Sequence, residues 1–84
     1  MHELVSIITP SYNTAAFIAD TIRSVQAQSY TNWEMIIVDD CSTDNTDVVV
    51  RGYLSDTRIK YLKNEINSGA AASRNRALRE AKGR

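Results

Sequence analysis

The chain has 84 residues, enough for one small domain, and its ten basic and ten acidic residues give a formal net charge of zero. Its 43% hydrophobic and 24% charged content is typical of a folded globular protein and excludes a disordered chain. The balanced charge excludes a global field for nucleic acid, and no window approaches the roughly 18 apolar residues of a membrane span.

The first two predicted elements are a strand and an amphipathic helix. Residues 4–9 are typical of a buried strand, and Pro10 is expected to end it because proline cannot donate to a sheet ladder. Thr14 is the expected N-cap of the helix. The apolar face of that helix has helical spacing and consists of Ile18, Ile22 and Val25.

The stretch 33–44 organises the rest of the chain. Residues 33–38 are mostly apolar, which predicts a strand buried on both faces of a parallel sheet, and they run directly into Asp39 and Asp40. Successive strand residues point to opposite faces, so the two carboxylates are expected to have different roles. Ligands of open α/β sheets bind outside the carboxyl ends of the strands, which favours a ligand at the aspartates. The alternative is that residues 40–44 only cap the next helix.

The remaining pattern predicts a helix over 46–54, a more polar strand over 59–62 near an edge of the sheet, and a final helix over 70–82. Asn67 or Ser68 is expected to cap the final helix, and Gly83 to stop it. The order β-α-β-α-β-α predicts a three-layer α/β/α fold with a parallel sheet. Three strands make a thin sheet, so we expect residues 1–84 to be the front part of a larger fold.

All three β-to-α turns should meet at one edge of such a sheet. They comprise residues 10–13, 39–42 and 67–69, and the last leads into the helix that carries Arg74. An aromatic ring can stack on a base, a carboxylate can accept from a base imide or a ribose hydroxyl, and guanidinium and helix-start amides suit phosphate. This combination favours a nucleotide ligand.

Arg74 is the sharper of these indications. Helical spacing predicts a sheet-facing stripe that consists of Ala71, Arg74, Leu78 and Ala81. A charge on a buried stripe is rarely structural unless it is paired. The alternatives are an ion pair with Asp39 or Asp40, or a buried stem whose charged end reaches water.

Several other kinds of site are excluded. No Gly-rich loop follows the first strand, which excludes the dinucleotide fingerprint and the P-loop. His2 is the only histidine and lies at the N-terminus, so a His-based triad or zinc site is not expected. Cys41 is the only cysteine, which excludes an internal disulfide and fits a reducing, cytoplasmic location.

Five short segments together resemble the N-terminal half of glycosyltransferase family 2. They are residues 5–13 (VSIITPSYN), 24–30 (SVQAQSY), 37–44 (IVDDCSTD), 67–69 (NSG) and 73–75 (SRN), and they span essentially the whole chain. The resemblance implies a GT-A-type fold, in which a Rossmann-like nucleotide-binding half joins an acceptor-binding half. It further implies an inverting enzyme of cell-envelope polysaccharide biosynthesis that transfers a hexosyl group from a nucleotide sugar, usually a UDP-sugar, to an acceptor hydroxyl.

The resemblance also implies roles for individual residues. Tyr12 would stack on uracil, with Pro10 lining the same pocket. Asp40 would accept a hydrogen bond from uracil N3–H, and Asp39 would support that loop. The other expected contacts lie along the nucleotide, the last of them nearest the base and phosphate: Asn13, Asn67, Gly69 and Arg74.

The family's Asp-x-Asp-type motif, which carries Mn²⁺ or Mg²⁺, is not found in this sequence, nor is a catalytic base. We therefore expect these 84 residues to bind the donor nucleotide, to hold no metal and to transfer no sugar alone. One alternative is a non-catalytic α/β module that forms a homodimer through its exposed sheet edge. A receiver-like phosphorylation domain is disfavoured, because its acidic pair should follow the first strand.

Overall fold

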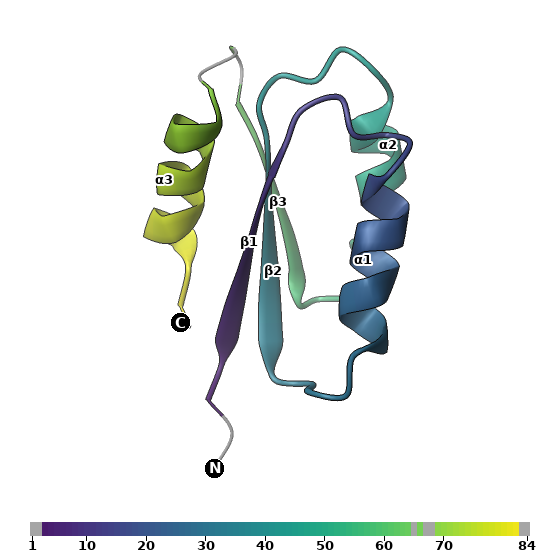
Figure 1. The fold of residues 1–84 in the computed structure, drawn as a ribbon, viewed down its shortest axis with the longest axis vertical. Coiled ribbons are helices and arrows are strands. Elements are labelled where there is room, and N and C mark those ends of the chain that lie inside the picture. The colour runs from purple at the N-terminus through teal and green to yellow at the C-terminus, as the bar shows by residue number, and fades with distance from the viewer. Residues whose placement is uncertain (1–2, 65, 67–68, 83–84) are drawn as a thin grey trace.

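The computed structural model describes residues 3–64, 66 and 69–82. Its elements follow the predicted β-α-β-α-β-α order (Figure 1). They are β1 (Val5–Ser11), α1 (Ile18–Ala27), β2 (Trp33–Asp39), α2 (Thr46–Arg51), β3 (Ile59–Lys63) and α3 (Ala70–Glu80). Asn67, Ser68 and Gly83, to which sequence reasoning gives helix-terminal roles, lie outside the described residues.

The three strands form a parallel sheet in the order β1-β2-β3, with β2 in the centre. All seven residues of β2 are buried, which confirms the prediction from its continuous apolar run. β1 and β3 are the edges of this sheet, and the edge position expected for the third strand is confirmed. Figure 1 shows α1 and α2 on one face of the sheet and α3 on the other, which is the predicted three-layer arrangement.

Each face of β2 contributes to its own apolar core. On one face, Met35 and Ile37 pack with Ile22 of α1 and Val50 of α2. On the other face, Ile36 and Val38 pack against Ala77 of α3, which is a smaller core. Because strand side chains alternate between faces, a strand covered by helices on both sides must be apolar at every position.

Several element boundaries differ from those predicted. Pro10 lies inside β1, opposite Val38, and does not end the strand. An edge strand tolerates this residue because the missing N–H leaves no partner strand unpaired. Thr14 is not the N-cap of α1, which begins at Ile18 after a turn in which the Thr14 carbonyl accepts from the N–H groups of Phe17 and Ile18, each at 2.8 Å. The second helix ends at Arg51, and residues 52–55 continue as turns.

α3 turns a different face to the sheet from the one its sequence predicts. Ser73 and Ala77 are fully buried, whereas Arg74 is exposed and the Leu78 side chain is 56% exposed. Ala81 is the member of the predicted stripe that packs against the core. Because Ser73 and Ala77 are small, the helix can lie close to β1 and β2. The prediction of a buried, sheet-facing Arg74 is therefore wrong.

Candidate functional site

The β-to-α connections of the described chain gather at the carboxyl edge of the sheet. Each parallel strand ends there, at Ser11, Asp39 and Lys63 respectively. Figure 1 shows the connections after β1 and β2 arching over this end of the sheet. The predicted meeting of the turns at one edge is confirmed for the described residues.

Asp39 anchors the turn that follows β2. Its side chain is fully buried, and its Oδ1 accepts hydrogen bonds from the Ser42 N–H at 3.0 Å and from the Ser42 hydroxyl. Its Oδ2 accepts from the Tyr61 hydroxyl of β3. Burial, followed by the hydrogen bond to Asp39, raises the pKa of Tyr61 far above its ordinary value, so the phenol keeps its proton and remains a donor.

Asp40 faces the α3 side of the sheet. Its side chain is 5% exposed, its Oδ2 accepts from the Gly69 N–H at 2.8 Å, and its Oδ1 accepts from Asn64 Nδ2 at 3.0 Å. Asn64 is held in turn by Arg76, which donates to its Oδ1 at 2.7 Å. The two adjacent aspartates therefore have different roles on opposite faces, as strand alternation predicts.

Asn13 joins the β1–α1 loop (residues 12–17) to the β2–α2 loop (residues 40–45). Its side-chain Oδ1 accepts from the Thr43 N–H at 2.8 Å and from the Asp44 N–H at 3.3 Å. Its own backbone N–H donates to the Ser42 hydroxyl oxygen at 2.9 Å. The backbone is left-handed at Asn13, with φ 52°, and at Cys41, with φ 61°. Two such residues in facing loops indicate turns held in shape by tertiary contacts.

A second set of bonds joins the same loops near the start of α2. The carboxylate of Asp44 accepts from the Ala15 N–H at 3.1 Å and from the Thr46 N–H at 3.0 Å. Thr46 also accepts from the Thr14 N–H at 3.1 Å. The Thr46 hydroxyl also donates to the Asp44 carboxylate, and this bond is the main cause of a pKa of Asp44 below its ordinary value. Asp44 therefore supports the start of α2 and also joins the two loops, so a turn that only caps the helix describes neither Asp44 nor Asp40.

The other predicted site residues lie at the same edge, but their side chains are more exposed than those of Asp39 and Asp40. The Tyr12 side chain is 50% exposed, and Pro10 is half-buried in the strand that precedes it. Arg74 lies in the first half of α3, and its side chain is exposed. The described donors to Asp39 and Asp40 are other groups, so the alternative of an ion pair between them and Arg74 is wrong among the described residues.

The described residues do not form a complete set of protein ligands for a divalent metal. Within residues 3–64, 66 and 69–82, no group of three or more His, Cys, Asp or Glu side chains could hold a metal ion. All four carboxylate oxygens of Asp39 and Asp40 accept hydrogen bonds from protein donors. The metal that the family resemblance implies would therefore need ligands other than these.

Sequence reasoning missed the residues that hold the predicted ones in place. Ser42 and Thr46 could have been found, because Ser42 lies three residues after Asp39 and Thr46 lies two residues after Asp44, both in a turn motif. Tyr61, Asn64 and Arg76 carried no such signal. Their bonds reach partners 12 to 24 residues away in the chain, and these contacts depend on the register of β2 and β3 and on the rotation of α3.

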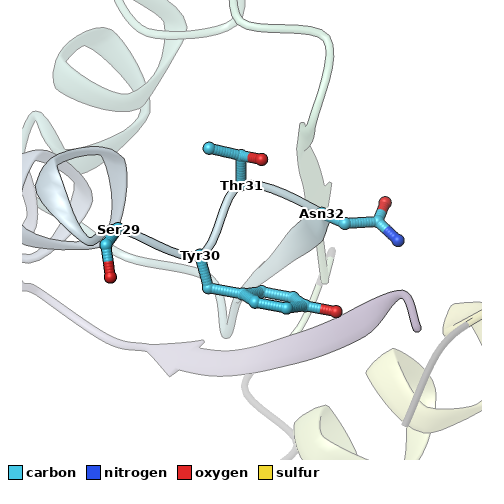
Figure 2. Close-up of a pocket in the computed structure, with 4 residues that line it drawn as sticks. All are labelled: Ser29, Tyr30, Thr31 and Asn32. Atoms are coloured by element: carbon cyan, nitrogen blue, oxygen red, sulfur yellow. The ribbon is translucent and has the colours of Figure 1, made fainter. Parts of the chain in front are cut away.

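A separate surface pocket of about 220 Å³ lies in the α1–β2 connection. Figure 2 shows its lining, Ser29, Tyr30, Thr31 and Asn32, on one continuous stretch of backbone. These residues precede β2, so the pocket lies at the amino edge of the sheet, opposite the site described above.

Among the described residues, no helix combines the length and apolar character needed to cross a bilayer.

This chain is similar to known glycosyltransferases in sequence and in fold. WfgD of Escherichia coli, named a UDP-Glc:α-D-GlcNAc-diphosphoundecaprenol β-1,3-glucosyltransferase, is 53% identical over 81 residues, which are 96% of this chain and 32% of WfgD. Residues 1–349 of TarS of Staphylococcus aureus, in complex with UDP-GlcNAc, match with a TM-score of 0.89 and 35% identity over 98% of this chain and 24% of that TarS chain. The mannosyltransferase PcManGT of Pyrobaculum calidifontis, in complex with GDP-Man and Mn²⁺, matches with a TM-score of 0.90 and 30% identity over 99% of this chain and 26% of PcManGT.

The chain thus spans about a third of the length of curated relatives such as WfgD. The GT-A glycosyltransferases among the solved structures share its Rossmann-like α/β arrangement. The profile of glycosyl transferase family 2 matches residues 6–84. Since that is nearly the whole chain, and the folds agree, this chain belongs to glycosyl transferase family 2.

Proposed function

We propose that this chain binds the nucleotide of a UDP-sugar at the carboxyl edge of its sheet, as the donor-binding part of an inverting hexosyltransferase. The observation that supports the proposal is the backbone hydrogen bond that joins the end of β1, one residue before Tyr12, to Asp40. The Asp40 N–H donates to the Ser11 carbonyl at 2.8 Å, so the backbone that leads into the exposed Tyr12 is joined to Asp40, whose carboxylate is held by Asn64 and Gly69.

In this proposal each group has a separate task. Tyr12 stacks on the uracil ring, which every base permits through its π-face. Asp40 accepts from the uracil N3–H, and this interaction is what distinguishes uracil from a base without a donor at that position. Arg74, exposed on α3, contributes a guanidinium that suits the diphosphate. Asp39 supports the Asp40 turn from the opposite face.

The relatives support a nucleotide-sugar donor. WfgD is named for UDP-Glc, TarS has structures with UDP and with UDP-GlcNAc, and PcManGT has one with GDP-Man and Mn²⁺. We favour UDP over GDP because WfgD, the relative with the highest identity of the three, is named for a uridine donor. The requirement for Mn²⁺ or Mg²⁺, inversion, a cytoplasmic location and the inactivity of the 84 residues alone stay predictions.

Calorimetric titration of this chain with UDP tests the proposal. We expect saturable binding of UDP and none of NAD, with UDP affinity at least roughly tenfold weaker in Asp40→Asn. Asp47→Asn is the matched control, because Asp47 lies in the first turn of α2 and outside the proposed pocket. No binding at millimolar UDP, or equal losses in both variants, would contradict the proposal.

A second candidate function is self-association through the sheet. β1 and β3 are both edges of the described sheet, and an edge strand presents backbone groups that a second copy of the chain could pair with. Sedimentation over a hundredfold range of concentration distinguishes the candidates. A mass that rises toward a dimer supports self-association, and a constant monomer mass at the highest concentration contradicts it.

A further inference from the structure

We propose that Asn13 is a positioning residue of this site, which holds the β1–α1 loop against the β2–α2 loop and does not itself touch the nucleotide. Its importance for binding rests on the proposed nucleotide function. The hydrogen bonds that carry the proposal are all within the protein and do not depend on a ligand. The proposal replaces the role that the family resemblance implies for Asn13, which is a contact along the nucleotide.

The side-chain oxygen of Asn13 is committed to the facing loop. Its Oδ1 accepts from the Thr43 N–H at 2.8 Å, from the Thr43 hydroxyl at 3.3 Å and from the Asp44 N–H at 3.3 Å. Its backbone N–H donates to the Ser42 hydroxyl oxygen at 2.9 Å. Asn13 therefore contacts three consecutive residues of the β2–α2 loop, and 29 to 31 positions of sequence separate it from them.

The bonds of Asn13 continue into the interior. The Ser42 hydroxyl that accepts from Asn13 donates in turn to Asp39, and the other oxygen of Asp39 accepts from Tyr61. This chain of bonds starts in the loop after β1, passes the end of β2 and reaches β3. Both loops are thereby fixed to the buried part of the sheet, because Asp39 is fully buried.

The residue type at position 13 fits this task. The backbone there is left-handed, with φ 52°, a conformation that asparagine adopts more readily than most residues other than glycine. Glycine would satisfy the backbone but would offer no side-chain acceptor to Thr43 and Asp44. Aspartate would offer the acceptor but would add a negative charge beside the Asp44 carboxylate. Asparagine meets both requirements without that charge.

Fixed loops preorganise the pocket. Tyr12 precedes Asn13 in the chain, and Asp40 precedes the turn that Asn13 contacts. The hydrogen bonds of Asn13 to residues 42–44, which we call the clamp, therefore hold the stacking ring and the base acceptor in one arrangement. Without it, the loops would have to be ordered when the ligand binds, and that cost would reduce affinity for the base. If Asn13 positions the loops, its loss should therefore reduce the affinities for uridine and for UDP by the same factor. If Asn13 instead contacts the diphosphate, its loss should reduce the affinity for UDP alone.

The test compares Asn13→Gly, which keeps the left-handed backbone and removes the acceptor, with Asn13→Asp, which restores the acceptor. We expect Asn13→Gly to weaken both uridine and UDP roughly tenfold, and amide hydrogen exchange at Thr43 and Asp44 to become faster. Asn13→Asp should recover most of the exchange protection and of the uridine affinity, and a remaining deficit is expected from the charge that it adds near Asp44. Asn45→Gly is the matched control, since the side chain of Asn45 makes no capping bond, and it should leave both affinities unchanged.

Loss of UDP affinity with unchanged uridine affinity would overturn the proposal and assign Asn13 to the diphosphate. Unchanged exchange at Thr43 and Asp44 in Asn13→Gly would overturn it as well. A wild-type chain that binds neither probe contradicts the proposed function, and the exchange measurement then decides by itself whether Asn13 holds the loops. Should Asn13→Gly fail to fold, Ser42→Ala removes the other end of the clamp, and the same equal losses are expected.

Discussion

At the scale of single residues, the site depends on two adjacent carboxylates that differ in environment. Asp39 is fully buried and stabilises the turn, while Asp40 is turned toward α3 and keeps a fixed orientation. The alternation of strand side chains makes this difference predictable from the sequence. Their partners Tyr61 and Asn64 are not predictable in the same way, because they come from another strand and its following loop.

Tyr61→Phe tests the role of the buried carboxylate. The substitution removes the hydroxyl donor from Asp39 Oδ2 and leaves a buried charged oxygen with one bond fewer. We expect the free energy of unfolding in urea to fall by about 1–3 kcal/mol. Tyr53→Phe is the matched control, since its hydroxyl accepts from Arg23 in an exposed bond, and it should change stability by less than about 0.5 kcal/mol. Equal effects would contradict the assigned role of Asp39.

Tyr12→Ala separates binding from stability. Half of the ring is exposed, so its removal should leave the thermal midpoint nearly unchanged. Loss of stacking on the base should weaken uridine binding by about 1–3 kcal/mol, measured by calorimetry. Tyr30→Ala, in the pocket at the opposite edge, should bind uridine as the wild type does. Comparable losses in the two variants would move the base away from Tyr12.

At the scale of elements, β2 was the easiest to predict and α3 the hardest. A run of apolar residues covered on both faces has one interpretation as a central strand. The buried positions of α3 are small, Ser73 and Ala77, so its hydrophobic pattern hardly fixes the rotation of the helix. The larger Leu78 gives the wrong rotation when it is assumed to face the sheet, because its side chain is exposed.

The rotation of α3 can be tested by two substitutions. Ala77→Leu adds volume where the helix packs on Ile36 and Val38, and should lower the free energy of unfolding by about 1–3 kcal/mol. Leu78→Ala removes an exposed side chain and should cost less than about 0.5 kcal/mol. Chemical denaturation measures both. The rotation predicted from sequence would reverse the order, with Leu78→Ala the more damaging.

The turn before β3 makes stability depend on pH. The Arg58 guanidinium donates to the Asp56 carboxylate, with 2.9 Å between Nη2 and Oδ2. The same guanidinium lies over the Trp33 ring, with its central carbon 3.9 Å from the ring centroid. Bonds from Arg58 are the main cause of a pKa of Asp56 well below its ordinary 3.8. A carboxyl whose pKa is lowered by folding stabilises the fold above the unfolded pKa and loses that contribution as the pH falls toward the folded value.

Asp56→Asn should therefore lower the free energy of unfolding by about 1 kcal/mol at pH 7, a value reduced for the partial exposure of the pair. The difference between wild type and variant should shrink as the pH falls below 3.8, the ordinary pKa of Asp56. Urea unfolding at pH 7, 4 and 2.5 measures it. A difference that stays constant across this range would contradict the assigned pairing.

At the scale of the whole molecule, a parallel sheet brings distant turns to one edge, and this much follows from the order of elements. The order of the elements does not predict which hydrogen bonds join the turns. The bonds of Asn13, Asp44 and Thr46 arise only when the first two loops face each other, and most span about 30 positions of sequence. The three layers were therefore predictable, and the hydrogen bonds that shape the site were not.

The central claim is that a nucleotide binds at this edge, and residue-resolved NMR of this chain during a UDP titration tests it most directly. We predict saturable shifts of the amides of Tyr12, Asp40 and Arg74, with none at Tyr30 in the pocket of the opposite edge. Shifts confined to residues 29–32, or no shifts at millimolar UDP in a folded chain, would contradict the claim.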